Sequence, residues 1–143
     1  MIIRDFHRGD VQQLFSLWDE LDMGGAERGD TTESIRRTLE MGGKLLVMED
    51  PESHRITGSS WMTCDGRRIF LHHFGIAKDY QRKGWGMKLA RESLKFIREK
   101  GYQVKLEVHQ DNLPAIRLYE KLGFRSFPGY DVYMIRKPRE TGD

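Results

Sequence analysis

The feature that most constrains the fold is a strand–helix–strand pattern in residues 70–109. Residues 85–101 place apolar side chains at steps of three and four, as an amphipathic helix does, and Gly101 is a typical C-terminal stop. Residues 102–110 then alternate apolar and polar side chains, which is typical of a strand with one buried face. A helix that connects two strands of one sheet packs on that sheet. The pattern therefore predicts a sheet with a helix on its face.

The rest of the chain supplies further strands and helices. Asp65-Gly66 is a strong hairpin dipeptide between two strand-like runs. In chain order we expect a strand in 1–6, helices in 8–22 and 31–43, a strand in 44–50, a hairpin in 54–77, the helix and strand described above, a helix in 112–123 and two closing strands in 124–137. This order predicts an α/β (α+β) fold, with a mixed, mostly antiparallel central sheet of about six to seven strands flanked by about four helices.

Length and composition favour a single domain over residues 1–143. The formal net charge is only +2, so anion binding must be local, and a nucleic-acid partner is not expected. Cys64 is the only cysteine, which excludes an internal disulfide and favours a reducing, cytoplasmic setting. The first residues lack the apolar run of a signal peptide, and no run is long enough to cross a membrane. No Cys and His spacing indicates a metal site, so we predict no metal.

Residues 79–90 mark one place where an anion can bind. The N–H groups that begin a helix have no partner within it and carry partial positive charge. Gly84 and Gly86 let a ligand approach the backbone closely, and four cations lie nearby in the sequence: Arg82, Lys83, Lys88 and Arg91. The pattern allows either a phosphate site or a turn with solvated cations. It lacks both the ending of a P-loop and the glycine pattern of a Rossmann fold.

The same residues carry a resemblance to a known family. Gln81-Arg82-Lys83-Gly84-Trp85-Gly86 resembles Gln/Arg-x-x-Gly-x-Gly/Ala, the acetyl-CoA motif of the GNAT N-acetyltransferase superfamily. A second match follows in VKLEVHQDNLPAIRLYEKLGF, residues 104–124, which is also similar to ribosomal-protein N-terminal alanine acetyltransferases. The resemblance covers residues 70–127, whereas residues 1–65 match only in the order of their elements.

The resemblance implies how acetyl-CoA is bound. The strand that ends near Ile76 is expected to splay from the strand that carries Glu107, with acetyl-CoA in the gap and its pyrophosphate on the loop amides. Residues 66–137 would form the acetyl-CoA-binding and catalytic half, and residues 1–65 the acceptor side. The implied acetyl-CoA contacts are Phe74, Ile76, Gln81, Arg82, Lys83, Gly84, Trp85, Gly86, Met87, Asn112 and Tyr119.

The resemblance also implies catalytic roles. The Ile76 N–H would stabilise the charge that develops on the thioester oxygen, a contribution often worth ~2.7–4 kcal/mol. Tyr119 would protonate the leaving thiolate, although its spacing with Ala115 and Leu122 also suits a core position. Asn112 would contact the pantetheine arm, and it can also serve simply as a helix cap.

The sequence leaves undecided which residue is the base that deprotonates the amine. Glu107 is the first candidate, on the polar face of its strand, and a surface glutamate facing Lys105 is the alternative. His72 and His73 are further candidates, and strand alternation predicts one on each face of the sheet. His109 shares the face of Glu107. Each histidine can equally be a satisfied or solvated side chain.

The acceptor is expected to be a primary amine, either a small molecule or a protein or peptide N-terminus. Acidic residues between the first two helices can attract a cationic amine or can be ordinary solvated charges: Asp22, Glu27, Asp30 and Glu33. Trp18 and Trp61 fit either an acceptor pocket or a core. The alternative function is a non-catalytic acetyl-CoA-binding or sensing module. The sequence allows a monomer or a homodimer and gives no sign of a membrane partner.

Overall fold

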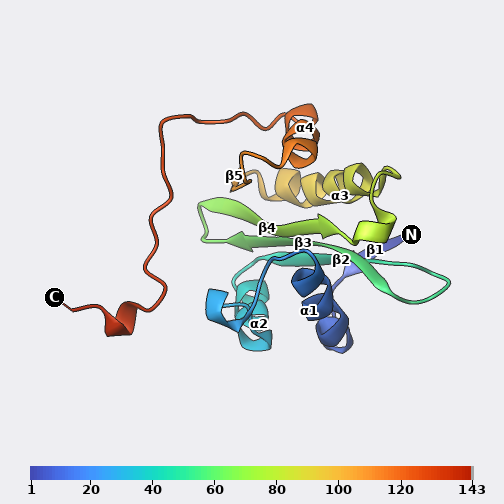
Figure 1. The fold of residues 1–143 in the computed structure, drawn as a ribbon, viewed down its shortest axis with the longest axis horizontal. Coiled ribbons are helices and arrows are strands. Elements are labelled where there is room, and N and C mark those ends of the chain that lie inside the picture. The colour runs from blue at the N-terminus through green and yellow to red at the C-terminus, as the bar shows by residue number, and fades with distance from the viewer. Residues whose placement is uncertain (143) are drawn as a thin grey trace.

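The computed structural model describes residues 1–142, which form three layers (Figure 1). One face of the central sheet is covered by α1 (Val11–Glu20) and α2 (Thr32–Glu40). The helices α3 (Trp85–Lys100) and α4 (Leu113–Lys121) lie on the opposite side. Among the described residues, no helix is both long enough and apolar enough to cross a membrane.

The central sheet has the order β1-β2-β3-β4-β5. Within residues 1–142 its strands are β1 (Ile2–Asp5), β2 (Lys44–Glu49), β3 (Ile56–Cys64), β4 (Arg68–Ile76) and β5 (Gln103–Leu106). Neighbouring strands are antiparallel except β4 and β5, which are parallel and are joined through α3. The predicted mixed, mostly antiparallel sheet is therefore confirmed, with five strands in the described chain instead of about six to seven.

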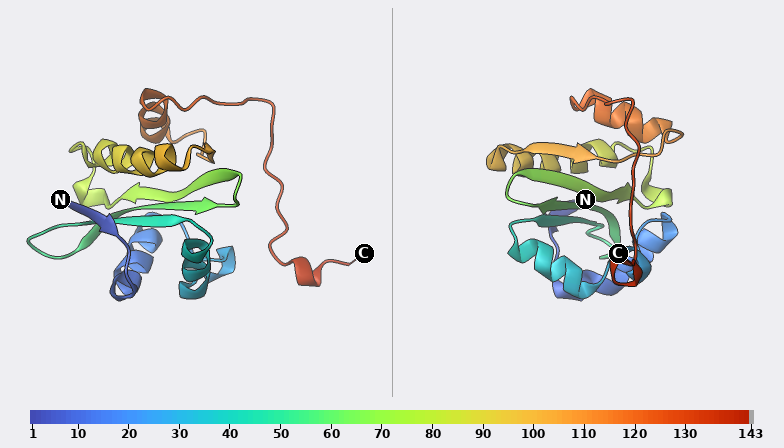
Figure 2. Two further views of the ribbon diagram at one scale, coloured as in Figure 1. Left: turned by 180° about the vertical axis from the view of Figure 1, so that it is seen from behind. Right: turned by 90° about the vertical axis from the view of Figure 1, so that its left-hand side faces the viewer.

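The two closing strands predicted in residues 124–137 are absent from the described chain, so this prediction was wrong. Residues 125–136 leave α4 as an extended arm that runs clear of the body (Figure 2). Their strand-like sequence does not produce a strand because a strand needs a neighbouring backbone to bond. Residues 125–136 neither donate nor accept a hydrogen bond with any described residue.

Each face of the sheet buries a core of its own. Beneath α1 and α2, the rings of Trp18 and Trp61 stack with centroids 5.6 Å apart. Their indole N–H groups donate to the hydroxyls of Ser59 and Thr38, so both indoles are satisfied in their polar atoms. Beneath α3 the core is mainly aliphatic and includes Met62, Ile69, Leu71, Leu89 and Ile97. The sheet lies between the two cores, and Tyr80 packs against both of them.

Candidate active site

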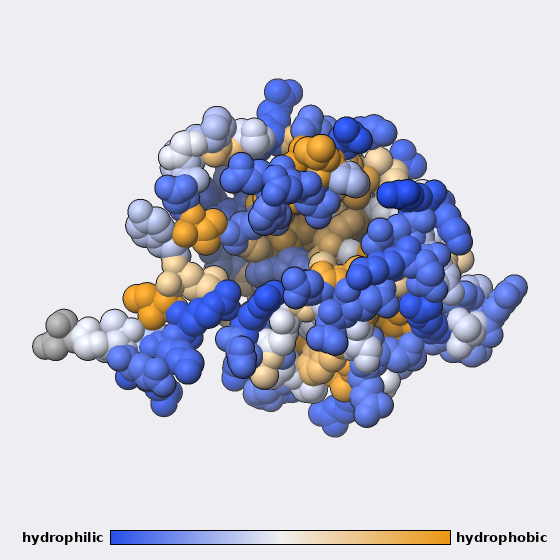
Figure 3. Space-filling view, in the orientation of Figure 1, coloured by the Kyte–Doolittle hydropathy of each residue, from blue (hydrophilic) through white to orange (hydrophobic). Residues whose placement is uncertain are grey.

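A gap opens between β4 and β5 where their pairing ends. The parallel register runs from Arg68 opposite Gln103 to Leu71 opposite Leu106. There β5 stops, whereas β4 continues to Ile76. Among the described residues, the backbone of residues 72–76 therefore has no partner strand on the β5 side, although the Ile76 carbonyl accepts from the Gln81 side chain. Figure 3 shows a hollow on this face of the molecule, between α4 and the sheet, with apolar side chains at its floor.

A bulge at His73 changes which way the β4 side chains point. The register with β3 shifts between Ser59 and Trp61, and His73 has a left-handed backbone with φ of 44°. The Ser59 hydroxyl donates to the His73 carbonyl at 2.6 Å, which holds the bulge. Both imidazoles lie against Trp61, with His72 and His73 centroids 5.7 and 5.2 Å from its ring. The expectation of one histidine on each face was wrong, because a bulge interrupts the alternation.

His73 is bonded to an acidic residue from the acceptor side. Its Nε2 lies 2.8 Å from Oδ2 of Asp30, in the loop between α1 and α2, and both side chains are largely buried. Because a carboxylate only accepts, this bond requires a hydrogen on Nε2, so in the neutral imidazole Nδ1 is an acceptor. That buried Nδ1 has no hydrogen-bond partner among the described residues.

His72 is chemically different from its neighbour. Its Nε2 forms a hydrogen bond of 2.6 Å with the Thr63 hydroxyl. Burial, together with the adjacent His73, lowers the pKa of His72 to about 4. His72 is therefore neutral near pH 7, and it is a weaker proton acceptor than an unperturbed histidine.

The loop before α3 has the geometry of an anion cradle. Arg82 and Gly84 both have left-handed backbones, with φ of 63° and 85°, so successive amides turn toward a common side. The amides from Arg82 to Met87 donate no hydrogen bond within the described chain. The side chain of Gln81 donates to the Ile76 carbonyl at 2.8 Å, which ties the loop to the end of β4. Six unpaired amides thus lie beside the open edge of β4.

Tyr119 joins α4 to the same end of β4. Its ring packs edge-on against Phe74 and Phe124, with centroids 5.9 and 5.7 Å away. A Cβ added to Gly86 would lie 3.7 Å from Leu118 and 3.9 Å from Ile76, so the start of α3 lies close to α4 and to the end of β4. Burial raises the pKa of Tyr119 to about 12. The hydroxyl therefore keeps its proton at neutral pH.

The structure places the remaining predicted residues at the surface. Asn112 caps α4, since its Oδ1 accepts from the Ala115 N–H at 3.3 Å, which confirms the capping interpretation. Glu107 follows the last residue of β5 and is exposed. His109 is also exposed, and its ring lies 3.7 Å from the carboxylate of Asp111. Within residues 1–142, no hydrogen bond or ion pair links Glu107 or His109 to Tyr119.

The loop between α1 and α2 closes over β4 at Gly75. A Cβ added there would lie 2.7 Å from Leu21 and 3.2 Å from Met23, so a larger residue would push the ends of these side chains aside. Sequence reasoning missed Gly75 and the pairing of Asp30 with His73. A glycine inside a strand-like run was the available signal, because it often marks a close approach. Among the acidic loop residues, Asp30 is buried, whereas Glu33 pairs with Arg36 on the surface of α2.

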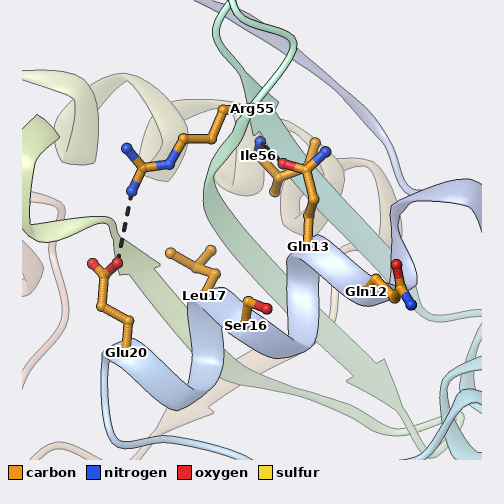
Figure 4. A pocket seen from close by; sticks show the side chains of 7 residues that line it. All are labelled: Gln12, Gln13, Ser16, Leu17, Glu20, Arg55 and Ile56. Carbon is orange, nitrogen blue, oxygen red and sulfur yellow. Dashed lines mark hydrogen bonds and ion pairs between the residues drawn. The ribbon is translucent and has the colours of Figure 1, made fainter.

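An open cavity lies elsewhere, along α1 (Figure 4). Its volume is about 430 Å³, and Arg55 and Glu20 approach each other across it at 3.6 Å. None of the residues assigned to acetyl-CoA or to catalysis lines this cavity: its walls are Gln12, Gln13, Ser16, Leu17, Glu20, Arg55 and Ile56. We therefore place the site at the gap between β4 and β5. Residues 1–142 contain no cluster of three or more side chains suited to holding a metal.

Comparison with known proteins gives a consistent pattern. The model of the acetyltransferase (GNAT) family matches residues 33–124. A mycothiol acetyltransferase of Clavibacter sepedonicus is 30% identical over 105 residues, 73% of this chain; the chain spans only 34% of that protein's length. An acetyltransferase of Yersinia pestis (strain Pestoides F) is 28% identical over 138 residues, covering 96% of this chain and 94% of the other.

Solved structures show the same fold. A GNAT-family acetyltransferase of Staphylococcus aureus superposes with a TM-score of 0.76 at 18% identity, over 87% of this chain and 82% of the other. The ribosomal-protein-S18-alanine N-acetyltransferase of Escherichia coli gives a TM-score of 0.72 at 18% identity, over 87% and 77%.

Proposed function

Because the family model covers more than half of its length, this chain belongs to the acetyltransferase (GNAT) family, and we propose that it transfers an acetyl group from acetyl-CoA to a primary amine. The observation that carries the proposal is the run of unpaired amides from Arg82 to Met87 beside the open edge of β4. A pyrophosphate requires several donors that converge on one side, and this loop supplies them at the positive end of α3.

The residues fit acetyl-CoA as a bound molecule. The loop amides, with Gln81 holding the loop in place, would bind the pyrophosphate, and the exposed edge of residues 72–76 would pair with the pantetheine arm. Phe74 and Asn112 would flank that arm. The molecule supplies the reactive thioester and, after transfer, a thiolate leaving group.

The chain's own groups would handle charge and protons. The Ile76 N–H donates to the thioester oxygen as negative charge develops there. The Tyr119 hydroxyl, protonated at neutral pH, passes its proton to the thiolate as the C–S bond breaks. The amine nitrogen forms the new bond to the acetyl carbon and gives its proton to a base. No covalent bond to the protein is required.

Two groups compete for the role of base. Glu107 lies just past the end of β5, where a carboxylate can act through water. His73 has a buried, unpaired Nδ1 on the α1 and α2 side, opposite the face on which Phe74 meets Tyr119. An amine that enters from the acceptor side would meet His73 first, which favours this histidine. The weak basicity of His72 makes it the poorest of the candidates.

The acceptor remains a choice between two classes of amine. The names of two similar proteins mention mycothiol and an alanine of ribosomal protein S18, so they point in different directions. We therefore propose either a small-molecule amine or a protein or peptide N-terminus. The proposal places the reaction in the cytoplasm, because a chain with one cysteine suits a reducing compartment.

A thiol-release assay over a panel of amines and peptides tests the proposal. Tyr119→Phe keeps the ring packing and removes the proton donor, so we expect kcat to fall by roughly 10²- to 10⁴-fold while coenzyme A still binds. Tyr102→Phe, at a partly exposed position outside the site, is the matched control and should leave kcat unchanged. If coenzyme A binds, no acceptor releases thiol and Tyr119→Phe has no effect, the chain is a binding module instead.

A further inference from the structure

The C-terminal arm carries an unusual amount of exposed apolar surface. Every residue from 125 to 142 is exposed. Six large apolar side chains of the arm are each at least 64% exposed: Phe127, Tyr130, Val132, Tyr133, Met134 and Ile135. The arm leaves the body after α4 and projects away from it (Figures 1 and 2), and apolar atoms gather along it in Figure 3. Contiguous apolar surface of this kind marks an interaction site on a folded chain.

The arm has the sequence of a strand that is buried on both faces. Residues 132–135, Val-Tyr-Met-Ile, form a continuous run of β-branched, aromatic and aliphatic side chains. Such a run is typical of a strand packed on both sides, unlike the alternation of a strand with one wet face. Its backbone is unpaired in the described chain. The arm therefore has the chemistry of a strand without the neighbour that a strand requires.

The sheet of the same molecule lacks a strand at the matching place. In the described chain β5 is the last strand of the sheet, and it pairs only with β4. Its outer edge is a row of free N–H and C=O groups, which templates pairing with another strand. Apolar side chains at both ends of β5 are partly exposed, namely Tyr102 and Val108, and Leu113 at the start of α4 is 52% exposed.

We propose that the arm of one copy adds as a strand to the free edge of β5 in a second copy, and that the arm of the second copy pairs in the same way with β5 of the first. Each chain carries one strand-like arm without a neighbour and one sheet edge without a strand. A second copy therefore supplies a partner for both the arm and the edge of β5. The three arm aromatics bury roughly 150–250 Å² each when covered. Two arms thus supply an area on the order of that in a standard protein interface.

The exchange also bears on the proposed active site, and this step rests on the proposed function. β5 ends at Leu106, one residue before Glu107. A partner strand on its outer edge would supply ladder bonds beyond Leu106 and extend β5 through Glu107. The gap between β4 and β5 would then have two ordered walls, one of them held by the partner copy.

Mass and cross-linking of the full chain test the exchange directly. Light scattering during gel filtration should give twice the chain mass of 16.8 kDa. A mixture of ¹⁵N-labelled and unlabelled protein, treated with an amine-reactive cross-linker, should link Lys137 at the end of the arm to Lys105 on β5 between light and heavy copies. A monomer, or links confined to one isotope, would overturn the proposal, since the arm would then be free or would fold onto its own sheet.

A matched pair of methionine substitutions isolates the arm from general surface effects. Met134 on the arm and Met41 after α2 are 65% and 66% exposed. Met134→Arg should weaken the dimer about tenfold or more and expose arm amides to hydrogen exchange, because a charge would enter a covered strand. Met41→Arg should leave the dimer unchanged. Equal effects of both variants, or none from Met134→Arg, would contradict the inference.

These measurements do not depend on catalysis. A dimer with cross-linked arms and no detectable acetyl transfer would refute the proposed function and leave the exchange standing. An active monomer would refute the exchange of arms and leave the proposed function standing.

Discussion

His73 has a backbone conformation that side-chain-bearing residues seldom adopt. The bulge that imposes it turns the imidazole onto Trp18, whose ring centroid lies 4.4 Å away, and within reach of Asp30. Strain of this kind persists only where surrounding contacts hold it, and it often accompanies function. The Ser59 bond to the His73 carbonyl and the Asp30 bond to its ring are those contacts.

Substitution of the two candidate bases separates their roles. Asparagine tolerates a left-handed backbone, so His73→Asn removes the imidazole with little added strain. We expect it to lower kcat/KM at neutral pH by roughly 10²-fold or more, as for loss of a general base. Glu107→Gln should have the smaller effect, because that side chain is exposed. A larger loss in Glu107→Gln would assign the base to Glu107.

His72 makes stability depend on pH. Its pKa is about 4 in the folded chain and near 6.5 when unfolded, so the unfolded state binds the proton more readily. The free energy of unfolding should therefore fall as pH drops from about 6.5 to about 4, by up to roughly 3 kcal/mol, and level off below. Urea titrations across this window measure the slope. His72→Gln should flatten it, and His109→Gln, at an exposed position, should not.

At the scale of elements, α3 begins and ends at glycines with left-handed backbones. Gly84 is its N-cap with φ of 85°, and Gly101 is its C-cap with φ of 73°. An added Cβ would meet nothing within 4 Å at either position, so conformation alone explains both residues. Only Gly84 lies in the proposed pyrophosphate loop. Gly101 is therefore a matched control for Gly84, because it has the same backbone conformation but lies outside the proposed loop.

Alanine at these two caps should separate stability from ligand binding. Gly84→Ala and Gly101→Ala should each cost about 1 kcal/mol of unfolding free energy, because alanine resists a left-handed backbone. Only Gly84→Ala should also raise the KM for acetyl-CoA, by roughly tenfold, since the amides would no longer converge. Thermal unfolding and steady-state kinetics give the two readouts. An equal rise in KM for both variants would mean that the loop does not hold the donor.

At the scale of the whole molecule, the sheet separates two chemical environments. The α3 side contains aliphatic side chains, the unpaired loop amides and Tyr119. The α1 and α2 side contains stacked indoles and a buried histidine–aspartate pair. In the proposed reaction, donor and acceptor would approach from opposite faces, at the place where β5 ends and β4 continues. With exchanged arms, the arm of the partner copy would hold β5, which is one wall of this gap.

A reciprocal exchange predicts that stability rises with protein concentration. Folding is then coupled to association, so mass action favours the folded dimer as concentration increases. The midpoint of thermal unfolding should rise by roughly 1–3 °C for each tenfold increase in protein. Met134→Arg should lower the midpoint and reduce this dependence. A midpoint independent of concentration in the unsubstituted protein would exclude an arm that stabilises the fold in trans.

The sequence by itself determined the helices, the strands up to β5 and the position of the glycine loop before α3. Apolar periodicity and capping residues identified α1 to α4, and Asp65-Gly66 marked the hairpin between β3 and β4, because these signals act between residues close in the chain. Spacing of Gly84 and Gly86 marked the start of α3 for the same reason. The tertiary structure alone decided which histidine has a buried nitrogen without a hydrogen-bond partner among the described residues. It did so through contacts across 43 positions, from Asp30 to His73, that no local pattern encodes.

The two strands predicted in residues 124–137 show the same difference between local sequence and tertiary structure. Local sequence correctly marks residues 132–135 as strand-forming, but a strand exists only where a second backbone pairs with it. Within one described chain that neighbour is missing, so the segment is an arm. Periodicity reports what a segment can become, because it depends on side chains a few residues apart. Pairing depends on which backbone lies alongside, and only the three-dimensional arrangement of the chain supplies that.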